Sequence, residues 1–183
     1  MLQKKTLRQK YFFIRKKKYF EINKRFSLPL MNFIKSKFKR KRIKIALYYP
    51  SNFEINVIKI LENNYFNDKK ILLPVIKKDN RMEFFSWKKN ESLFVNKFGF
   101  LEPIISNPQI PDIILVPVLA FDGNKYRLGY GKGFYDRYLN RYIKKFKNII
   151  TVGIAFSFQK YNKLPVDKND VRLNFVLTEK GFY

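Results

Sequence analysis

The chain contains no cysteine and no histidine, and only seven glycines in 183 residues. Without cysteine it can form no disulfide, no thiolate metal site and no cysteine nucleophile. Without histidine it can form neither a serine–histidine relay nor an imidazole metal site. Any metal ion must therefore be a hard cation bound by oxygen ligands, which favours magnesium.

Long apolar runs are also absent, since none approaches the roughly 20 residues of a membrane helix. The short run Tyr11–Ile14 leads directly into the basic Arg15–Lys18, which is not the pattern of a signal peptide. Apolar residues nevertheless make up 46% of the chain, as in a globular protein with a buried core. We therefore expect a cytoplasmic protein with one domain, residues 1–183, and no membrane association.

Acidic residues are scarce, and the formal net charge is +25. Residues 1–44 hold 17 Lys and Arg residues against one acid, Glu21. We expect a basic helical segment, residues 1–40, packed on the domain. Its charge allows two interpretations: a surface for nucleic acid, or biased composition, since Lys, Asn, Ile and Phe are abundant throughout the chain. Charge alone favours the second.

Hydrophobic spacing predicts alternating strands and helices. Helices are predicted at Leu2–Phe20, Leu30–Phe38, Glu54–Asn64 and Tyr135–Phe146, and strands at Ile43–Tyr49, Ile71–Val75, Arg81–Trp87, Ile113–Leu119, Ile149–Ala155 and Asn174–Thr178. The alternation indicates an α/β fold with a parallel sheet covered on both faces. Such sheets bind ligands at the carboxyl ends of their strands.

The segment Arg127–Arg137 places three glycines at alternate positions among several cations, between a predicted strand and a predicted helix. A glycine-rich turn before a helix exposes backbone N–H groups that can bind phosphate. It is not a Walker loop, because Gly133 stands where Ser or Thr would bind magnesium, and its glycine spacing is not the dinucleotide fingerprint. The alternative is a turn that needs positive φ, with Asp136 favouring the helix N-terminus.

Several segments together resemble the 5-formyltetrahydrofolate cyclo-ligase family, also called methenyltetrahydrofolate synthetases. The matching segments are Lys4–Arg8, Glu54, Phe98–Pro103, Val116–Asp122, Arg127–Arg137, Leu164–Pro165 with Asp170, and Thr178–Glu179. The resemblance covers nearly the whole chain and implies a single three-layer α/β/α domain with a mainly parallel sheet and an N-terminal helix.

The resemblance implies a ligase of one-carbon metabolism. Such an enzyme converts 5-formyltetrahydrofolate and ATP to 5,10-methenyltetrahydrofolate, ADP and phosphate, by phosphorylation of the formyl oxygen and ring closure by N10. It implies magnesium as cofactor and no obligatory protein partner. The alternative is a basic nucleic-acid-binding protein on a degenerate cyclo-ligase fold, with nucleic acid as a less favoured partner.

The resemblance also implies roles for individual residues. ATP contacts are expected from Lys4, Lys5, Thr6, Leu7, Arg8, Arg127, Leu128, Gly129, Tyr130, Gly131, Lys132, Gly133, Phe134 and Tyr135, with Lys132 and Arg127 as catalytic residues. Folate contacts are expected from Tyr49, Glu54, Tyr130, Gly131, Lys132, Gly133 and Phe134, and magnesium ligands are Asp136 and Asp170. On a helix, Lys4 and Arg8 would share one face.

Each of these side chains also has a plain structural interpretation. The charges of Lys4 and Arg8 would be solvated, Glu54 would cap the following helix, and Asp136 and Asp170 would be caps or surface acids. Phe85 and Trp87 are expected in the core rather than against folate.

The chain departs from the family pattern in two places. Lys125 stands where the family usually has glycine, two residues before Arg127. Gly123 is the candidate to support that turn instead, with the hairpin shifted. The segment Ser51–Phe53, before Glu54, matches only loosely.

Overall fold

The computed structural model describes residues 2–39, 42–143, 145–146 and 148–183, which form a fold around a seven-stranded sheet. The strands of this sheet are β1 (Lys44–Ala46), β2 (Lys70–Ile76), β3 (Met82–Ser86), β6 (Ile113–Pro117), β9 (Ile150–Ile154), β10 (Phe175–Thr178) and β11 (Gly181–Phe182). Their order in space is β11-β10-β9-β6-β1-β2-β3. The inner strands are parallel, and the edge strands β3 and β11 are antiparallel to their neighbours. The predicted mainly parallel sheet is confirmed.

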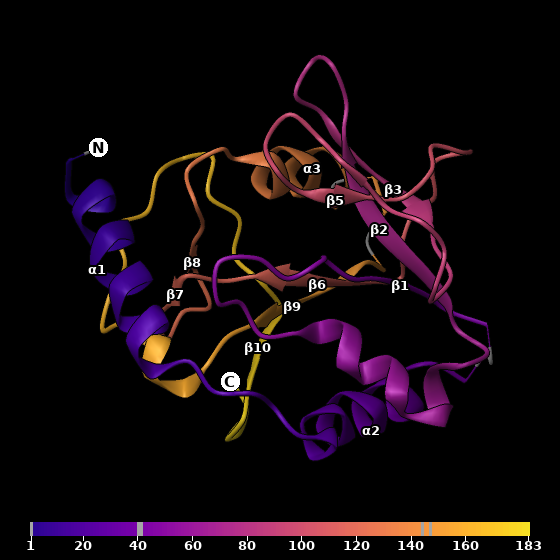
Figure 1. The fold of residues 1–183 in the computed structure, drawn as a ribbon. Helices are drawn as coiled ribbons and strands as arrows, with labels where there is room; N and C mark the ends of the chain where they lie inside the picture. Colours follow the sequence, from indigo (N-terminus) through magenta and orange to yellow (C-terminus); the bar gives the residue numbers. More distant parts are fainter. Residues whose placement is uncertain (1, 40–41, 144, 147) are drawn as a thin grey trace.

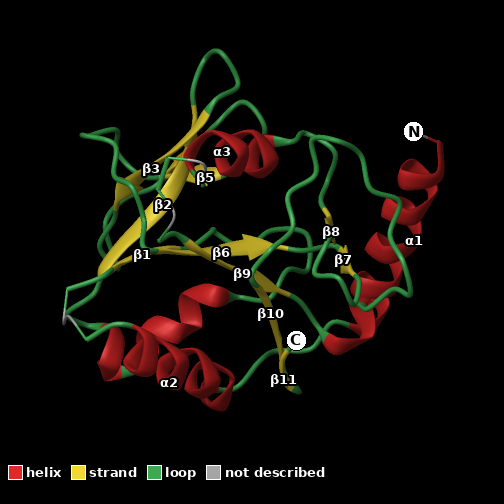
Figure 2. Cartoon of the chain, turned by 180° about the vertical axis from the view of Figure 1, so that it is seen from behind, coloured by secondary structure: helices red, strands yellow, loops and turns green. Residues whose placement is uncertain are grey.

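Helices cover both faces of the sheet. The α-helices are α1 (Leu2–Lys18), α2 (Ser27–Lys37) and α3 (Phe134–Tyr142), and the 3₁₀ helices are η1 (Lys24–Phe26), η2 (Val57–Glu62), η3 (Asn64–Phe66) and η4 (Ser157–Gln159). In Figures 1 and 2, α3 lies on one side of the sheet and α2 on the other, while α1 stands beside one end of it. The α/β fold class is confirmed.

Strand β6 shows how the sheet contributes to two cores. Successive side chains of a strand point to opposite faces. Ile113 and Leu115 belong to a buried cluster that includes residues of α2, whereas Ile114 and Val116 belong to a second cluster that includes residues of α3. Because both faces are covered, the strand is a continuous apolar run rather than an alternating one.

The segment predicted as a helix at Glu54–Asn64 is instead two 3₁₀ helices, η2 and η3, so this prediction was wrong in helix type and extent. The side-chain oxygen of Asn56 accepts a hydrogen bond from the N–H of Ile58, and that of Asn63 accepts one from Tyr65. These local bonds start two tight turns in place of one continuous α-helix.

A hairpin that the sequence patterns did not predict separates β6 from the glycine loop. Its strands are β7 (Ala120–Phe121) and β8 (Arg127–Leu128), which pair antiparallel. The buried carboxylate of Asp122 holds the turn, because its Oδ1 accepts the N–H groups of Asn124 and Tyr126, both at 3.0 Å. The hairpin carries the end of β8 directly into the glycine loop.

The conformation of this turn corrects the expectation for Gly123. Lys125 itself adopts the left-handed region, with φ of 66°. Gly123 does not have a positive φ. Gly123 therefore does not take over the left-handed position of this turn, and a lysine occupies the strained position that would suit glycine.

Helix α1 packs on this hairpin. Leu7 and Tyr11 are buried in a cluster with Leu119, Leu128 and Leu164. None of the helices in the described part of the chain combines the length and apolar character of a membrane span. The two remaining short strands, β4 (Phe94–Val95) and β5 (Leu101–Glu102), form a separate antiparallel pair.

The ends of several elements differ from prediction. α1 ends at Lys18 rather than Phe20, α2 begins three residues before Leu30, and α3 ends at Tyr142 rather than Phe146. Lys144, within the predicted last turn, lies outside the described residues, as do Met1 and Arg40 at the ends of the basic N-terminal segment. The division into a single domain stays a prediction.

Candidate active site

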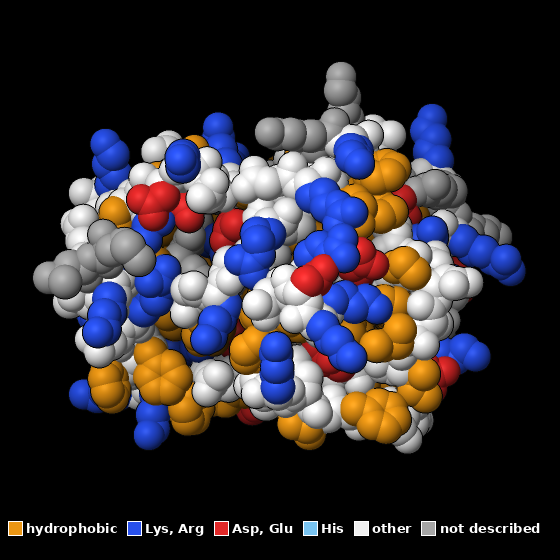
Figure 3. Space-filling view, turned by 90° about the horizontal axis from the view of Figure 1, so that it is seen from above, with side chains coloured by type: hydrophobic (Ala, Val, Ile, Leu, Met, Phe, Trp, Pro, Cys, Tyr) orange, Lys and Arg blue, Asp and Glu red, His pale blue; other side chains and the backbone are white. Residues whose placement is uncertain are grey.

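A cavity of about 1080 Å³ opens at the carboxyl ends of β1, β2 and β6. Its walls come from α1, the loop after β1, the glycine loop, the start of α3 and the segment at residues 167–170. This is where the sequence predicted a ligand site, since parallel α/β sheets bind ligands at the carboxyl ends of their strands. We call it the carboxyl-edge cavity. Figure 3 shows the surface from above, where Lys and Arg side chains surround acidic ones.

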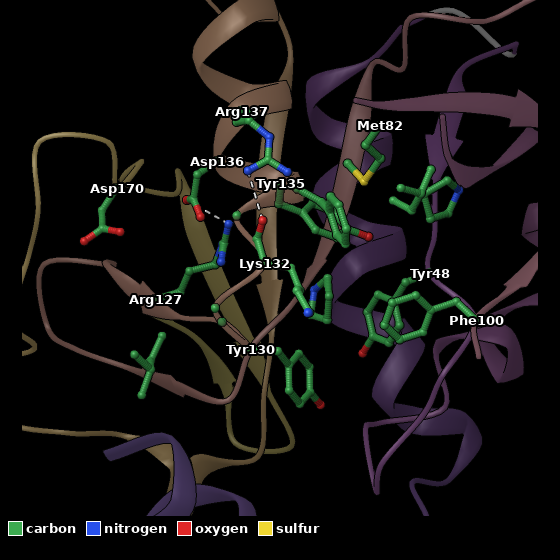
Figure 4. A pocket seen from close by; sticks show the side chains of 18 of the residues that line it. Tyr48, Met82, Phe100, Arg127, Tyr130, Lys132, Tyr135, Asp136, Arg137 and Asp170 are labelled. Carbon is green, nitrogen blue, oxygen red and sulfur yellow. Dashed lines mark hydrogen bonds and ion pairs between the residues drawn. The ribbon is translucent and has the colours of Figure 1, made fainter. Parts of the chain in front are cut away.

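The cavity has a charged side and an apolar side. In Figure 4, Arg127, Asp136 and Asp170 lie on one side, Tyr48 and Phe100 on the other. Further apolar lining comes from Pro74, Ile76, Met82, Leu101 and Phe134. Lys132 and Tyr130 lie between the two sides (Figure 4). The two halves suit ligand parts of different chemistry.

The glycine loop lines the charged side with little side-chain bulk. Gly131 has φ of 94°, and a Cβ atom there would lie 3.2 Å from Cζ of Arg8. A Cβ at Gly129 would lie 2.8 Å from Nη1 of Arg127. Nε of Arg8 also donates to the carbonyl oxygen of Gly129 at 2.8 Å. The glycines thus allow two guanidinium groups to lie against the loop backbone, a role that sequence spacing alone did not indicate.

Arg127 and Asp136 form a largely buried ion pair. Nη2 of Arg127 lies 2.8 Å from Oδ1 of Asp136, and the two side chains are 5% and 20% exposed. Nε of Arg127 and the hydroxyl of Tyr135 are buried, and neither has a hydrogen-bond partner among the described residues. Buried polar groups normally have partners. Both residues line the cavity, so a bound ligand can supply the missing acceptors or donors.

Lys4 bridges two carboxylates at the opposite end of the charged side. Its ammonium group lies 2.6 Å from Asp167 and also contacts Asp170. Burial alone would lower the pKa of Lys4, but the hydrogen bonds to Asp167 and Asp170 outweigh it and raise the pKa above its usual value. The plain interpretation of Lys4 as a solvated charge is wrong, because only 11% of its side chain is exposed.

The face of α1 that lines the cavity carries some of the residues expected to contact ATP. Lys4, Lys5 and Arg8 line the cavity, as the shared helical face predicts. Thr6 does not line it. Leu7 is buried against the hairpin, because it lies on the face of the helix that packs on the core. The expected contacts of Thr6 and Leu7 with a nucleotide are therefore not supported by their positions.

The donor set for magnesium rests on Asp136 and Asp170. Within the described residues no three acidic side chains gather in a metal-binding group. The hydrogen bonds and ion pairs of Asp136 use Oδ1, and those of Asp170 use Oδ2. One oxygen of each remains for a cation. Magnesium commonly takes one or two carboxylates, with phosphates and water completing its shell. The residues fit such an ion and not an all-protein cage.

Glu54 lies on the inner wall of the cavity and is 7% exposed. Its Oε2 accepts the N–H of Ser51 at 2.8 Å, and its Oε1 accepts the hydroxyl of Tyr130 at 2.9 Å. Burial raises the pKa of Glu54, and the hydrogen bond from Ser51 and the nearby Arg15 oppose that shift. Glu54 is not the cap of η2, since the side chain of Asn56 takes that place.

The remaining expected residues divide between cavity and core. Tyr49 lines the cavity and is 37% exposed. Leu128, Gly133 and Phe134 also line it. Phe85 and Trp87 are buried in the core and do not line it, as expected.

Glu102 and Arg15 are among the charged residues at this site to which sequence reasoning assigned no role. Glu102 lines the cavity, and its Oε1 accepts the N–H of Ile76 at 2.7 Å and the side-chain amide of Asn96 at 2.5 Å. Arg15 lies behind the cavity wall and contacts Tyr130. A usable signal existed for Arg15, because it follows Arg8 by seven residues, about two helical turns.

Comparison with known proteins gave concordant matches. The sequence model of the 5-formyltetrahydrofolate cyclo-ligase family matches residues 3–179. The 5-formyltetrahydrofolate cyclo-ligase of Haemophilus influenzae is 31% identical over 146 residues, which cover 76% of this chain and 77% of that protein. The enzyme of the same name from Mycoplasma pneumoniae is 31% identical over 137 residues, covering 74% and 73% of the two chains.

Solved structures agree with the sequence matches. The 5,10-methenyltetrahydrofolate synthetase of Aquifex aeolicus superposes with a TM-score of 0.76 and 32% identity, covering 100% of this chain and 92% of that one. The Mycoplasma pneumoniae synthetase superposes with a TM-score of 0.70 and 26% identity, covering 95% and 97%.

Proposed function

The chain belongs to the 5-formyltetrahydrofolate cyclo-ligase family, and we propose that it uses ATP to convert 5-formyltetrahydrofolate to 5,10-methenyltetrahydrofolate, releasing ADP and phosphate. Family membership makes it a ligase whose substrate is a folate. The dependence on ATP, the magnesium ion, the cytoplasmic location and the roles of individual residues are the finer parts of the proposal.

The observation that carries the proposal is the two-sided carboxyl-edge cavity. Its volume of about 1080 Å³ is at the upper end of the roughly 300–1,000 Å³ of small-molecule sites. The charged side, with the glycine loop, suits the phosphates of a nucleotide. The apolar side, with one buried carboxylate, suits a flat ring with hydrogen-bond donors. Both reactants can then meet between the two sides, near Lys132.

The proposed chemistry has two steps. The formyl oxygen of the substrate attacks the γ-phosphorus of ATP, and the bond from that phosphorus to the β–γ bridging oxygen breaks as ADP leaves. N10 of the folate then attacks the activated formyl carbon. The carbon–oxygen bond breaks, phosphate departs with the former formyl oxygen, and N10 loses its proton. Phosphoryl transfer depends on positioning and charge neutralisation more than on a dedicated base, so a site without histidine or cysteine is suitable.

On the charged side, the cations of the chain are proposed to neutralise the transferring phosphoryl group. Lys132 is exposed at the cavity and free to reach it. Arg8 and Arg127 are held in place by their contacts with Gly129 and Asp136. Preorganised donors of this kind stabilise developing charge without moving during the reaction.

Magnesium fits the free carboxylate oxygens of Asp136 and Asp170, where it would neutralise phosphate charge. The ammonium group of Lys4 contacts Asp170 and is available to the same phosphates. These residues bind and orient the nucleotide.

On the apolar side, Glu54 is proposed to accept hydrogen bonds from the pterin ring, with Tyr49 and Tyr130 beside it. A carboxylate in a partly desolvated wall makes strong hydrogen bonds to N–H donors. This fixes the orientation of the folate so that its formyl oxygen faces the charged side.

A turnover assay tests the proposal directly. The purified protein with 5-formyltetrahydrofolate, ATP and magnesium should produce the absorbance of the methenyl product and one phosphate per product. Omission of ATP should abolish the signal. Absence of product with folded protein and fresh substrate would contradict the proposed function.

The alternative of nucleic-acid binding stays untested. Part of the charge of the basic N-terminal segment lies at the carboxyl-edge cavity and not on an open surface for nucleic acid. Lys4, Lys5 and Arg8 line this cavity, and Arg15 lies behind its wall. We expect no obligatory protein partner. Filter binding of RNA and DNA at two salt concentrations, beside the turnover assay, separates the two functions.

A further inference from the structure

Arg15 is buried, with only 1% of its surface exposed, although it belongs to a helix rich in exposed cations. Its Nη2 donates to the hydroxyl of Tyr130 and, at 2.7 Å, to the carbonyl oxygen of Asn52. Its Nη1 lies 3.3 Å from the carbonyl oxygen of Val118. A buried charge needs such partners, because desolvation without them is costly. These partners therefore hold the guanidinium group of Arg15 in a fixed position, and Arg15 does not line the cavity itself.

The hydroxyl of Tyr130 links Arg15 to Glu54 through two hydrogen bonds. The hydroxyl of Tyr130 accepts a hydrogen bond from Arg15 and donates its own to Oε1 of Glu54 at 2.9 Å. Because the arginine can only donate, the direction of this chain of hydrogen bonds is fixed. Arg15 thereby turns the proton of Tyr130 toward the carboxylate and orients the tyrosine ring, which lies 5.4 Å from its guanidinium carbon.

The contact with Asn52 supports the turn that carries Glu54. Asn52 and Phe53 both adopt the left-handed region, with φ of 48° and 63°. Such conformations in non-glycine residues cost free energy and persist only where the surroundings enforce them. The hydrogen bond from Arg15 to Asn52, and the bond from the N–H of Ser51 to Glu54, close this turn from two sides. The guanidinium group of Arg15 is thus connected to Glu54 in two ways, through the hydroxyl of Tyr130 and through the turn at residues 51–54.

We propose that Arg15 is a positioning residue for the folate, which keeps Glu54 directed into the carboxyl-edge cavity through Tyr130 and the turn at residues 51–54. The inference deepens the proposed function and rests on it, since it assigns Glu54 to the pterin ring. It adds a determinant of folate affinity that touches neither the folate nor the nucleotide.

The electrostatic part of this role follows from the groups that face Glu54. Besides Arg15 on α1, these are Tyr48 after β1, Tyr130 of the glycine loop and Tyr135 on α3. Arg15 is the cation with the largest effect on Glu54. Burial raises the pKa of Glu54, and Arg15 opposes that shift. Loss of Arg15 therefore raises the pKa of Glu54 further and favours its protonated form.

The test compares Arg15→Met with Lys17→Met, which removes an equal charge from an exposed position of the same helix. Binding of 5-formyltetrahydrofolate is measured by calorimetry without ATP, and turnover is measured at varied concentrations of each substrate. Arg15→Met should weaken folate binding roughly tenfold to hundredfold, the range of a lost charged hydrogen bond. The KM for folate should rise far more than the KM for ATP. Lys17→Met should match the wild type.

Two further readouts separate positioning from a merely structural role. The double variant Arg15→Met with Glu54→Gln should bind folate no more weakly than Glu54→Gln alone, because Arg15 acts through Glu54. In Arg15→Met the loss of folate affinity on acidification should begin at a higher pH than in the wild type, because the loss of Arg15 raises the pKa of Glu54.

Several outcomes overturn the inference. These are wild-type folate affinity in Arg15→Met, multiplicative losses in the double variant, or equal losses for folate and ATP. If Arg15→Met does not fold, Tyr130→Phe gives the same comparison, since it cuts the route to Glu54 but keeps Arg15. Its folate affinity should fall, and an unchanged affinity contradicts the inference. If the wild type itself binds no 5-formyltetrahydrofolate, the proposed function fails first.

Discussion

The two ends of the parallel strands both carry an excess of cations, but they use them differently. The carboxyl-edge cavity is lined by acids as well as cations, and Arg127 and Lys4 each contact a carboxylate there. At the amino ends of β1 and β2, a smaller cavity of about 670 Å³ holds a second group of cations, which we call the amino-edge groove. Its cations are Arg42, Lys44, Lys69, Lys70, Lys88 and Lys89, with Asp68 as its acid.

The two regions differ in how their cations are paired. In the amino-edge groove, the side chain of Lys69 is 5% exposed and lies 2.6 Å from Asp68, while Lys88 and Lys89 are exposed. In the carboxyl-edge cavity, Lys4 contacts two carboxylates and Arg127 a third, and these two side chains are 11% and 5% exposed. Exposed cations are solvated and screened, and they contribute little to the stability of the folded chain. Buried cations held by carboxylates keep their position before a ligand arrives. Net charge alone therefore does not locate the site in this basic protein.

The largest expected effect is on catalysis. Lys132→Ala should lower turnover roughly 10²-fold to 10³-fold, because it removes a group proposed to stabilise the transferring phosphoryl charge. Its melting temperature should change little, since Lys132 is exposed. The matched control is Lys88→Ala in the amino-edge groove, which should keep full turnover. Equal losses in both variants would remove the distinction between the two regions.

The next effect is on stability. Asp136→Ala leaves the guanidinium group of Arg127 buried without its partner, which should cost about 3–5 kcal/mol. Chemical denaturation measures this loss. The control Asp79→Ala breaks the exposed ion pair with Arg81 and should leave the unfolding midpoint unchanged. A small loss in Asp136→Ala would mean that the pair is solvated and that the cavity is less preorganised than its geometry indicates.

A smaller effect, a gain in stability, is expected from a substitution in the β7–β8 hairpin that leads into the glycine loop. Lys125→Gly relieves a left-handed lysine and should stabilise the protein by roughly 0.5–1 kcal/mol, with unchanged turnover. Gly123→Ala should be neutral by comparison, because its Cβ would meet no atom within 4 Å and φ there is not positive. Thermal unfolding of Lys125→Gly and Gly123→Ala measures both effects. A loss of stability in Lys125→Gly would contradict the strain assigned to Lys125.

The smallest expected effect is on the pH dependence of folding. Burial raises the pKa of Glu54 above its ordinary value of 4.5, so the folded state holds its proton more tightly than the unfolded chain. Its contribution to stability is fully present below pH 4.5 and is lost as pH rises through the folded pKa. Glu54→Gln should remove this contribution to the dependence of the unfolding free energy on pH. The unfolding free energies of the wild type and of Glu54→Gln, measured from pH 4 to pH 7, show whether the wild type loses stability relative to the variant as pH rises.

The sequence predicted the sheet well because its strands are buried on both faces. Ile113–Leu119 is an unbroken apolar run and Ile149–Ala155 is broken only by Thr151 and Gly153, as is typical of strands covered on both faces. The prediction failed at Glu54–Asn64, where apolar spacing suggested one helix and asparagine side chains formed two tight turns. It also missed β7 and β8, because strands this short leave no periodic pattern.

For the site, local motifs were sufficient where the residues lie close in the chain. The glycine loop was predicted from its spacing and the pair Lys4 and Arg8 from the family resemblance, and the structure brings them together. Leu7 was assigned to the nucleotide with its neighbours, but its helical position turns it toward the core. A stretch of consecutive residues cannot all face one ligand on a helix.

The sequence by itself determined the α/β class, the family resemblance, the glycine loop between strand and helix, and the absence of histidine and cysteine chemistry. These depend on residue identity and short spacing, which a chain carries before it folds. Only the tertiary structure decided that Arg15 is buried against Tyr130, that Glu54 accepts hydrogen bonds from Ser51 and Tyr130, and that Lys125 takes the strained position. Those features depend on burial and on partners distant along the chain, so a cation's neighbours, and not its own identity, decide whether it is solvated or part of the site.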